Sequence, residues 1–377
     1  MKRRVLFYSV GRSDYNRYLP ILEKLKYEKN VNFAIALNSV HLSIKFGNTY
    51  KFVDNKFKLF IPKQTKNKFK NKRDIINNFA ENLKFLNNVF HKFKPDLLVV
   101  LGDRYEMICA PLCAVQYNIP IIHFYGGSTT LGSIDDYIRN AITQMSHFHF
   151  VATKQYKDKI AQMTDKKNNI KLAGLIGFQR EIKKEIIEKK KFFKKIKLKP
   201  QSFILLSFHP ETKSKIDINF QLKLLAKVIK KINIRFIITY PNADLGNDKI
   251  INFYKKILNS YSNVTLIKNC GQNLFLNFIH YSSLMMGNSS AGIVESSLLN
   301  KTSINIGVRQ KGKVIPKNVL NAKWEEKDIL KNINTILSKK INKDKLMTFN
   351  AYNEKISALK VAKIISKVDL IKLKNFQ

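Results

Sequence analysis

Several polar side chains that could do chemistry come directly after short apolar runs in this sequence. Asp103 follows the run "LLVVLG", and His209 follows "FILLSF". A carboxylate just after a buried strand is partly desolvated, which raises its pKa toward that of a useful general acid or base. A histidine in such a place suits a departing diphosphate as a cation or donor. An ion pair of Asp103 with Arg104 is the structural alternative.

The stretch "IIHFYGGSTTLGSIDDYIRNA", residues 121–141, places acids and a base at a predicted helix start. Asp135 and Asp136 open the helix, and Arg139 follows one turn later. Asp135 and Arg139 are four residues apart, so they could form a simple helical salt bridge. Because a Gly-Gly loop at a strand end precedes them, they could instead position a sugar.

The stretch "LMMGNSSAGIVESSLL" predicts a strand, a turn and a helix, with Ser289, Ser290 and Gly292 at the helix start. Free backbone N–H groups and the helix dipole favour an anion there, most simply a phosphate. Glu295, on the first turns, could then accept hydrogen bonds from a ribose diol. A well-capped helix explains the same residues without a ligand, because Ser is a favoured N-cap residue.

These segments belong to a pattern in which short apolar runs alternate with longer helical patterns, which predicts βαβ units and parallel sheets. We expect two doubly wound, Rossmann-like α/β domains that face a cleft, residues 1–175 and 176–377, and the last helix could pack back on the first domain. The connection is the charged stretch at about 180–200. The predicted strands are RVLFYSV, FAIALN, DLLVVLG, PIIHFYG and FHFVAT in the first domain, and SFILLSFHP, IRFIITYPN, NVTLIKN, SLMMGNSS and TSINIG in the second.

Ligands of open parallel sheets bind outside the carboxyl ends of the strands. Polar residues directly after the predicted strands are therefore the candidates for a site. They are Gly11 to Asp14, Gly102 to Arg104, His123 to Ser128, His209, Asn242 with Asp244, and Asn288 to Ser290.

The formal net charge of +41 and the isoelectric point of about 10.0 would suit a nucleic-acid-binding protein. The excess lysine is, however, mixed with Asn, Ile and Phe, as in "KKEIIEKKKFFKKIKLK", which is what an AT-rich coding sequence produces. The sequence contains no zinc-finger or RNP-type aromatic motif. We therefore expect solvated lysine-rich faces and no nucleic-acid partner, with a nucleic-acid-binding protein as the less favoured alternative.

No apolar run approaches the roughly 20 residues that span a bilayer. The start "MKRRVLFYSVGRSD" has too short an apolar run for a signal peptide. We expect a cytoplasmic chain with no membrane partner. Cys109, Cys113 and Cys270 lack the spacing of metal ligands, which favours buried structural roles.

Several motifs in order resemble the hydrolysing UDP-N-acetylglucosamine 2-epimerases of sialic-acid and related nonulosonate biosynthesis. The motifs are GRSDYNRYLPIL, GDRYEM, NIPIIHFYGGSTTLGSIDDYIRNAITQMSHFHFVAT, SFHPET, YPNAD, and GNSSAGIVES with NIGVRQKGK. The resemblance spans nearly the whole chain and implies the GT-B fold, a UDP-sugar substrate, a homo-oligomer (dimer or tetramer), and no metal or redox cofactor. A GT-B glycosyltransferase that passes the sugar to an acceptor is the alternative.

The chemistry that the resemblance implies is cleavage of the sugar–diphosphate bond with loss of the hydrogen at carbon 2, followed by addition of water to the glycal. Asp103 would be an acid/base, Asp135 or Asp136 would assist at the sugar, and Arg139 would orient that acid or bind phosphate. The residues expected to hold the substrate and its nucleotide diphosphate are Arg12, His209, Asn242, Ser289, Ser290, Gly292, Glu295 and Arg309.

The sequence departs from the family pattern at four positions, one of which is Tyr125 in place of the second histidine of the pattern His-x-His-Gly-Gly-Glu. The pattern His-x-His-Gly-Gly-Glu ends here in Ser128, so a carboxylate expected opposite Asp103 is missing. Asn140 replaces the histidine after the helix arginine, and Val308 replaces the acid after "NIG". Fold and nucleotide binding depend less on these positions than the exact reaction does. The choice among UDP-N-acetylglucosamine, a 4-acetamido-6-deoxy analogue and a GDP-linked sugar stays open.

Overall fold

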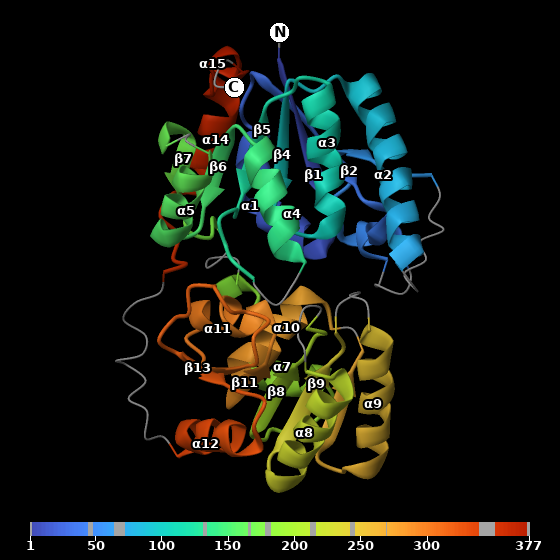
Figure 1. The fold of residues 1–377 in the computed structure, drawn as a ribbon, viewed down its shortest axis with the longest axis vertical. Coiled ribbons are helices and arrows are strands. Elements are labelled where there is room, and N and C mark those ends of the chain that lie inside the picture. Colours follow the sequence, from blue (N-terminus) through green and yellow to red (C-terminus); the bar gives the residue numbers. More distant parts are fainter. Residues whose placement is uncertain are drawn as a thin grey trace. The chain divides into compact units, whose positions relative to one another are not determined.

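The computed structural model describes residues 2–43, 48–63, 72–130, 134–164, 167–177, 182–211, 216–241, 246–268, 270–338 and 351–374. The chain forms two compact units (Figure 1). The first consists of Met1–Ser128, Ile134–Phe178 and Asn353–Gln377, and the second of Thr129–Ser133 and Gln179–Tyr352. Each unit is built on one parallel sheet with its own hydrophobic core, which confirms the predicted pair of parallel-sheet α/β domains.

The first sheet has seven parallel strands in the order β3-β2-β1-β4-β5-β6-β7, so the order reverses between β1 and β4. The interior strands are almost wholly apolar because helices cover both faces of the sheet. The strands are β1 (Arg3–Ser9), β2 (Val31–Leu37), β3 (Lys58–Phe60), β4 (Leu97–Leu101), β5 (Ile121–Phe124), β6 (Phe148–Val151) and β7 (Ile170–Leu172).

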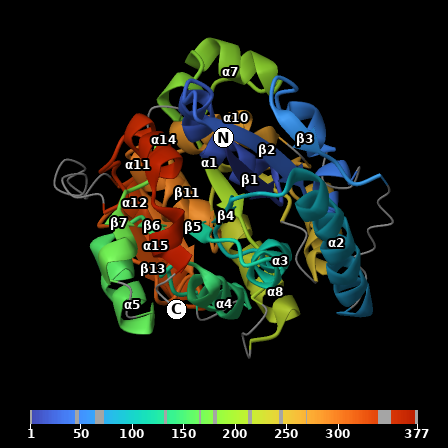
Figure 2. The ribbon, with the colours of Figure 1, turned by 90° about the horizontal axis from the view of Figure 1, so that it is seen from above.

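Two layers of helices cover the first sheet (Figure 2). One face packs against α1 (Arg12–Leu25) and α14 (Ala358–Lys367). The opposite face packs against α2 (Lys72–Phe93), α3 (Cys109–Gln116) and α4 (Asp135–Met145). The remaining helices are α5 (Lys154–Thr164), α15 (Leu370–Lys374) and the 3-10 turns η1 (Ser39–Leu42), η3 (Thr49–Phe52), η4 (Tyr105–Ile108) and η5 (Lys167–Asn169).

The C-terminal helix α14 is an integral part of the first unit. It contributes Val361, Ala362 and Ile365 to the core beneath β1. The Arg3 guanidinium at the start of β1 donates hydrogen bonds to the carbonyls of Ile365 and Val368, both at 2.7 Å. The first and last described segments of the chain therefore stabilise the same sheet.

The second sheet has six parallel strands in the order β10-β9-β8-β11-β12-β13, which reverses between β8 and β11. Its strands are β8 (Phe203–Ser207), β9 (Arg235–Thr239), β10 (Val264–Ile267), β11 (Leu284–Gly287), β12 (Ser303–Ile306) and β13 (Val319–Ala322). One face packs against α8 (Ile218–Lys231), α9 (Asn247–Ser260) and α12 (Glu326–Leu337), and the other against α7 (Lys189–Lys195) and α10 (Gly271–Tyr281).

Every strand predicted from the sequence is present, although β1 begins one residue and β2 two residues before the predicted segment, whereas β3, β7 and β13 were not predicted. These three short strands lie at sheet edges, where a strand has one neighbour and needs no continuous apolar run. Cys109 and Cys113 are buried, as expected, whereas Cys270 is only partly buried. Among the described residues, no helix has the length and apolar character to cross a membrane.

Candidate functional site

The reversal of strand order in each sheet gathers most of the polar residues predicted to form a site. In open α/β sheets, ligands bind at this reversal, outside the carboxyl ends of the two strands concerned. In the first sheet these strands are β1 and β4, which are followed by Arg12 and Asp103 respectively. In the second sheet they are β8 and β11, which are followed by His209 and by Ser289 with Ser290.

A fully buried arginine fixes the position of Asp103. Arg139 on α4 is 0% exposed, and its guanidinium donates to the Asp103 carboxylate, to Asp136 Oδ1 at 3.0 Å and to the Ser128 carbonyl at 2.7 Å. Burial by itself lowers the pKa of Arg139, but Asp103 and then Asp135 and Asp136 raise it above its ordinary value. Arg139 is therefore a permanent cation that holds two carboxylates in place.

The geometry shows which ion pairs form around Asp103 and within α4. Arg104 forms its ion pair with Glu106, at 3.1 Å, while Asp103 pairs with Arg139. The ion pair within α4 joins Arg139 to Asp136, three residues earlier, and Asp135 acts on Arg139 through its charge. Asp103 thus belongs to a cluster of three acids around one cation.

A neutral histidine holds the backbone directly before Asp103. His123 Nε2 lies 2.9 Å from the Gly102 carbonyl, and His123 Nδ1 lies 3.3 Å from Thr143 Oγ1. Because a carbonyl only accepts, Nε2 carries the proton and Nδ1 accepts from the threonine. Burial lowers the pKa of His123 to about 4, so the ring is uncharged at neutral pH. Gly126 is required beside it, since a Cβ there would lie 2.9 Å from both His123 Nδ1 and Thr143 Oγ1.

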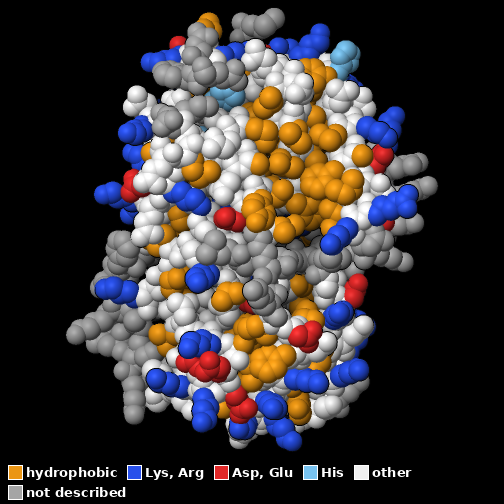
Figure 3. Space-filling view, in the orientation of Figure 1, with side chains coloured by type: hydrophobic (Ala, Val, Ile, Leu, Met, Phe, Trp, Pro, Cys, Tyr) orange, Lys and Arg blue, Asp and Glu red, His pale blue; other side chains and the backbone are white. Residues whose placement is uncertain are grey.

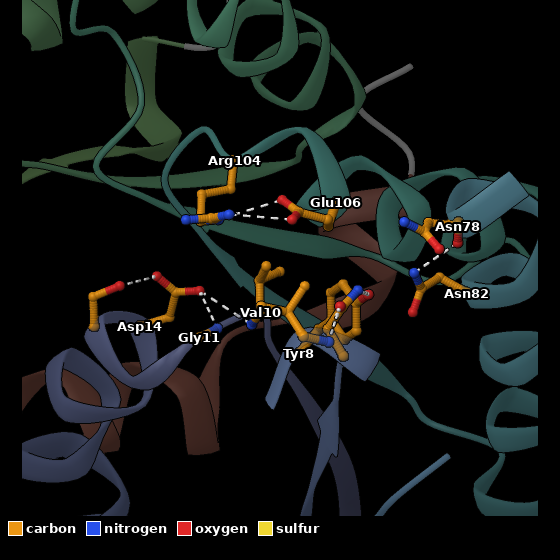
Figure 4. A network of polar contacts seen from close by, with 11 residues as sticks. Tyr8, Val10, Gly11, Asp14, Asn78, Asn82, Arg104 and Glu106 are labelled. Carbon is orange, nitrogen blue, oxygen red and sulfur yellow. Dashed lines mark hydrogen bonds and ion pairs between the residues drawn. The ribbon is translucent and has the colours of Figure 1, made fainter. Parts of the chain in front are cut away.

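The loop after β1 is held by a buried carboxylate, Asp14, which was among the candidate positions after this strand but without a specific role (Figure 4). Asp14 is 5% exposed, and its Oδ2 accepts the N–H groups of Val10 at 3.1 Å and Gly11 at 3.2 Å. Burial raises the pKa of Asp14 to about 6, and the nearby charge of Arg104 opposes that rise. An acid three residues after a helix N-cap is a capping-box pattern, so the signal was present in the sequence. Arg12 is the first residue of this helix, α1.

The second unit has a hydrogen-bonded framework at its own strand reversal, centred on Asn288. The Asn288 side chain accepts from the His209 N–H at 2.7 Å and donates to the His209 carbonyl at 2.8 Å. The Asn288 carbonyl in turn accepts from Gln310 Nε2 at 2.9 Å and from Arg309 Nη1 at 3.3 Å. Asn288 and Gln310 are completely buried. The loops after β8, β11 and β12 are therefore tied together at one place.

The segment after β11 differs from the single helix that was predicted. It consists of the 3-10 turn η6 (Ser290–Gly292), capped by Ser289 Oγ, and the one-turn helix α11 (Glu295–Leu298). The hydroxyl of Ser296 donates to the Gly292 carbonyl at 2.6 Å, and the hydroxyl of Ser303 donates to the same carbonyl. These hydroxyls compete with the backbone for that acceptor, which disfavours a continuous helix. The helix dipole therefore favours a bound anion less than the sequence suggested. The N–H groups of the serine-capped turn are the remaining donors for an anion.

The other predicted positions are distributed as follows. Glu295 is the first residue of α11, and Val308 is exposed in the loop after β12. Asn140 is on α4, and its Oδ1 is buried without a partner within the described part of the chain. Asn242 lies outside the described residues. No group of three or more His, Cys, Asp or Glu residues suited to a metal ion occurs in the described segments.

Two doubly wound parallel-sheet domains with polar loops at both strand reversals define a protein of the GT-B type. The model of the family described as UDP-N-acetylglucosamine 2-epimerase matches residues 23–366, and the chain belongs to that family.

Similar proteins cover almost the whole chain. A GDP/UDP-N,N'-diacetylbacillosamine 2-epimerase (hydrolyzing) of Campylobacter jejuni is 30% identical over 335 residues, which are 87% of this chain and 86% of that protein. The polysialic acid biosynthesis protein P7 of Escherichia coli is 28% identical over 99% of this chain and 95% of its own length. The S. aureus MnaA–UDP structure shares the fold, with a TM-score of 0.76 at 16% identity, and 96% of each chain is covered.

We predict that Asp14→Asn stabilises the protein at pH 8 and has little effect near pH 4. The pKa of Asp14 is about 6 in the fold against an ordinary value of 3.8, so the folded state binds this proton more tightly than the unfolded state. The resulting stability is present below pH 3.8 and is lost as the pH rises through 6. The loss approaches about 3 kcal/mol at full ionisation, and urea unfolding of both proteins between pH 4 and 8 measures it.

The control is Asp217→Asn, which alters an exposed carboxylate that caps α8. A difference between wild type and Asp14→Asn that stays constant over this pH range would contradict the assignment of a buried, titrating Asp14.

Proposed function

We propose that this chain is a hydrolysing 2-epimerase that converts a UDP-linked N-acetylglucosamine-type sugar into UDP and the free 2-epimeric sugar. The observation that carries the proposal is the Asp103 carboxylate, fixed by the buried Arg139 after β4, next to the strand reversal of the first sheet. The names of its relatives support UDP-N-acetylglucosamine, or its 4-acetamido-6-deoxy analogue linked to UDP or GDP, as the substrate. The product would enter the biosynthesis of sialic-acid-like sugars for surface polysaccharide.

The proposed reaction has two steps. In the elimination, a base takes the proton from carbon 2 while the bond from carbon 1 to the diphosphate oxygen breaks, which leaves a glycal and UDP. In the hydration, water adds its hydroxyl at carbon 1, and a proton returns to carbon 2 from the opposite face. The base and the acid therefore act on opposite faces of carbon 2, and two separate groups are needed.

Asp103 is the first of these groups, and Asp135 or Asp136 at the start of α4 is the second. Ser128 replaces the carboxylate of the family pattern, and a serine has no basicity at neutral pH without a partner. Arg139 contacts both Asp103 and Asp136, so it sets the distance between the two acids. His123 acts indirectly, through the Gly102 carbonyl that precedes Asp103.

The second unit is proposed to hold the nucleotide. His209 and Arg309 supply donors for the diphosphate, and the N–H groups of the serine-capped turn η6 add to them. Glu295 accepts hydrogen bonds from the ribose hydroxyls. Ser289, Ser290 and Gly292 belong to this turn, and Arg12 and Asn242 complete the set expected from the sequence.

The direct test is incubation of the enzyme with UDP-N-acetylglucosamine alone in heavy water. We expect release of UDP and of free N-acetylmannosamine that carries deuterium at carbon 2, because the returning proton comes from solvent. NMR of the sugar and chromatography of UDP measure both products, and the diacetamido and GDP-linked sugars are compared in the same assay.

UDP release that requires an added acceptor would establish the alternative, a GT-B glycosyltransferase. Free sugar with retained configuration and no deuterium would reject the epimerase mechanism in favour of simple hydrolysis.

We predict that Asp103→Asn and Glu295→Ala have opposite effects. Asp103→Asn should abolish turnover and leave the Kd for UDP within about threefold, because it removes a proton-transfer group and not a nucleotide ligand. Glu295→Ala should weaken UDP binding at least about tenfold, since the ribose hydroxyls lose their acceptor. Calorimetry with UDP and turnover assays separate the two. A parallel loss of turnover and UDP affinity in Asp103→Asn would assign Asp103 a structural or binding role.

We also propose that the protein is a homo-oligomer that associates through the face formed by α2, α3 and α4. Figure 3 shows hydrophobic side chains gathered over these helices. The helix α3 has the sequence CAPLCAVQ, without a charged residue, in a chain of net charge +41. Like-charged copies repel least at such a face, and large apolar patches commonly mark protein interfaces. The exposed large apolar residues there are Ile76, Leu112, Val115, Tyr117, Ile134 and Tyr137.

We predict that Val115→Lys dissociates the oligomer, because it places a desolvated cation in the interface. Light scattering coupled to size exclusion measures the mass of each species. The control is Phe220→Lys, which alters an exposed apolar residue on α8 of the second unit. An assembly that survives Val115→Lys would place the interface elsewhere.

A further inference from the structure

Glu211 is a buried carboxylate two residues after His209 that the proposed mechanism does not use. Its side chain is only slightly exposed, and four N–H groups surround it. Glu211 Oε1 accepts the backbone N–H groups of Val308 and Arg309, each at 3.2 Å. Glu211 Oε2 accepts from Gln221 Nε2 at 3.1 Å and from Trp324 Nε1 at 3.3 Å. Both carboxylate oxygens are thus occupied by donors from three different segments.

The loop after β12 passes very close to this carboxylate. Gly307 has a φ of +79°, and a Cβ at that position would overlap Glu211 Oε1 and the Trp324 indole. Trp324 also packs edge-on against Phe208, with ring centroids 5.5 Å apart, directly before His209. The chain therefore needs a glycine at 307 so that the next two N–H groups can reach Glu211.

These contacts attach the loop after β12 to the loop after β8. Arg309 is held at its backbone by Glu211 and at its side chain by the Asn288 carbonyl. Asn288 is bonded in both directions to His209. Glu211 and Asn288 are therefore two independent links between the same loops, and only the Glu211 link fixes the backbone from which the Arg309 side chain starts.

We propose that Glu211 is a positioning residue of the nucleotide site, which holds Arg309 beside His209 by accepting two consecutive backbone N–H groups. This inference rests on the proposed function, since it takes the second unit as the part that binds UDP. The negative charge of Glu211 by itself disfavours UDP binding, because a nearby carboxylate repels a diphosphate. The role of Glu211 is therefore to accept hydrogen bonds, and it needs no negative charge.

Two substitutions separate hydrogen-bond geometry from charge. Glu211→Asp keeps the charge but is one methylene shorter, so its oxygens no longer reach both the loop N–H groups and the Gln221 and Trp324 donors. Glu211→Gln loses the charge but keeps an oxygen for Val308 and Arg309, and the Gln221 amide can turn to accept from the new NH2 group. It loses the 3.3 Å bond from Trp324 Nε1, which does not hold the loop after β12. We expect UDP to bind at least about fivefold more weakly to Glu211→Asp and within about threefold of wild type to Glu211→Gln.

The measurement is calorimetric titration of the full chain with UDP, at a temperature at which circular dichroism shows each variant to be folded. The control for lost stability is Asp217→Ala, which removes the side-chain cap of α8, the helix that carries Gln221. It should lower the melting temperature and leave the Kd for UDP unchanged.

Wild-type affinity in Glu211→Asp, or weaker binding by Glu211→Gln than by Glu211→Asp, would overturn the inference while wild type still binds UDP. A wild-type chain that binds no UDP would overturn the proposed function and this inference with it.

Discussion

Each sheet consists of parallel strands that must be covered by helices on both faces, and this requirement organises everything else in the molecule. Crossovers between parallel strands are right-handed, so a chain that added strands in one direction only would place all its helices on one face. Covering the second face requires one reversal of strand order, which occurs between β1 and β4 and between β8 and β11. The loops that carry Asp103 and His209 follow strands at these reversals.

The two units treat buried charge in opposite ways. In the first, a buried cation, Arg139, is paired with the carboxylates of Asp103 and Asp136. In the second, the buried carboxylate of Glu211 accepts hydrogen bonds from the N–H groups of Val308 and Arg309, and so orders the loop after β12 that carries Arg309. A buried charge is tolerated only when it is paired or fully hydrogen-bonded. The chain carries 68 lysines and arginines. Among the described residues, Arg139 is the one lysine or arginine whose side chain is fully buried, whereas the others lie wholly or partly at the surface.

The sequence predicted the interior of both sheets well, because a strand covered on both faces must be apolar throughout, as in β4 and β8. The short edge strands β3, β7 and β13 escaped prediction, since segments such as "KLF" carry too little pattern. The residues after strand ends followed from topology. The ion-pair partners of these residues could not be predicted. From the sequence, Asp103 could pair with either Arg104 or Arg139, and only the packing of α4 brings Arg139 to Asp103. Asp14 was among the candidates after the first strand, but its role in holding the loop was not predicted, although the capping-box spacing signals it. Glu211 was missed because the loop N–H groups and the Trp324 indole reach it only through packing.

The path of the chain has a consequence for its synthesis. The first unit contains β1 near the N-terminus and α14 near the C-terminus, and the whole second unit lies between them in sequence. During synthesis, α1 can cover part of the apolar surface beneath β1, but the part that α14 covers stays exposed until residues 353–377 have been added. The second unit consists of the continuous segment Gln179–Tyr352 and the five residues Thr129–Ser133. All of it is synthesised before residues 353–377, so it can fold earlier. The core of the first unit is therefore completed only after the second unit has been synthesised.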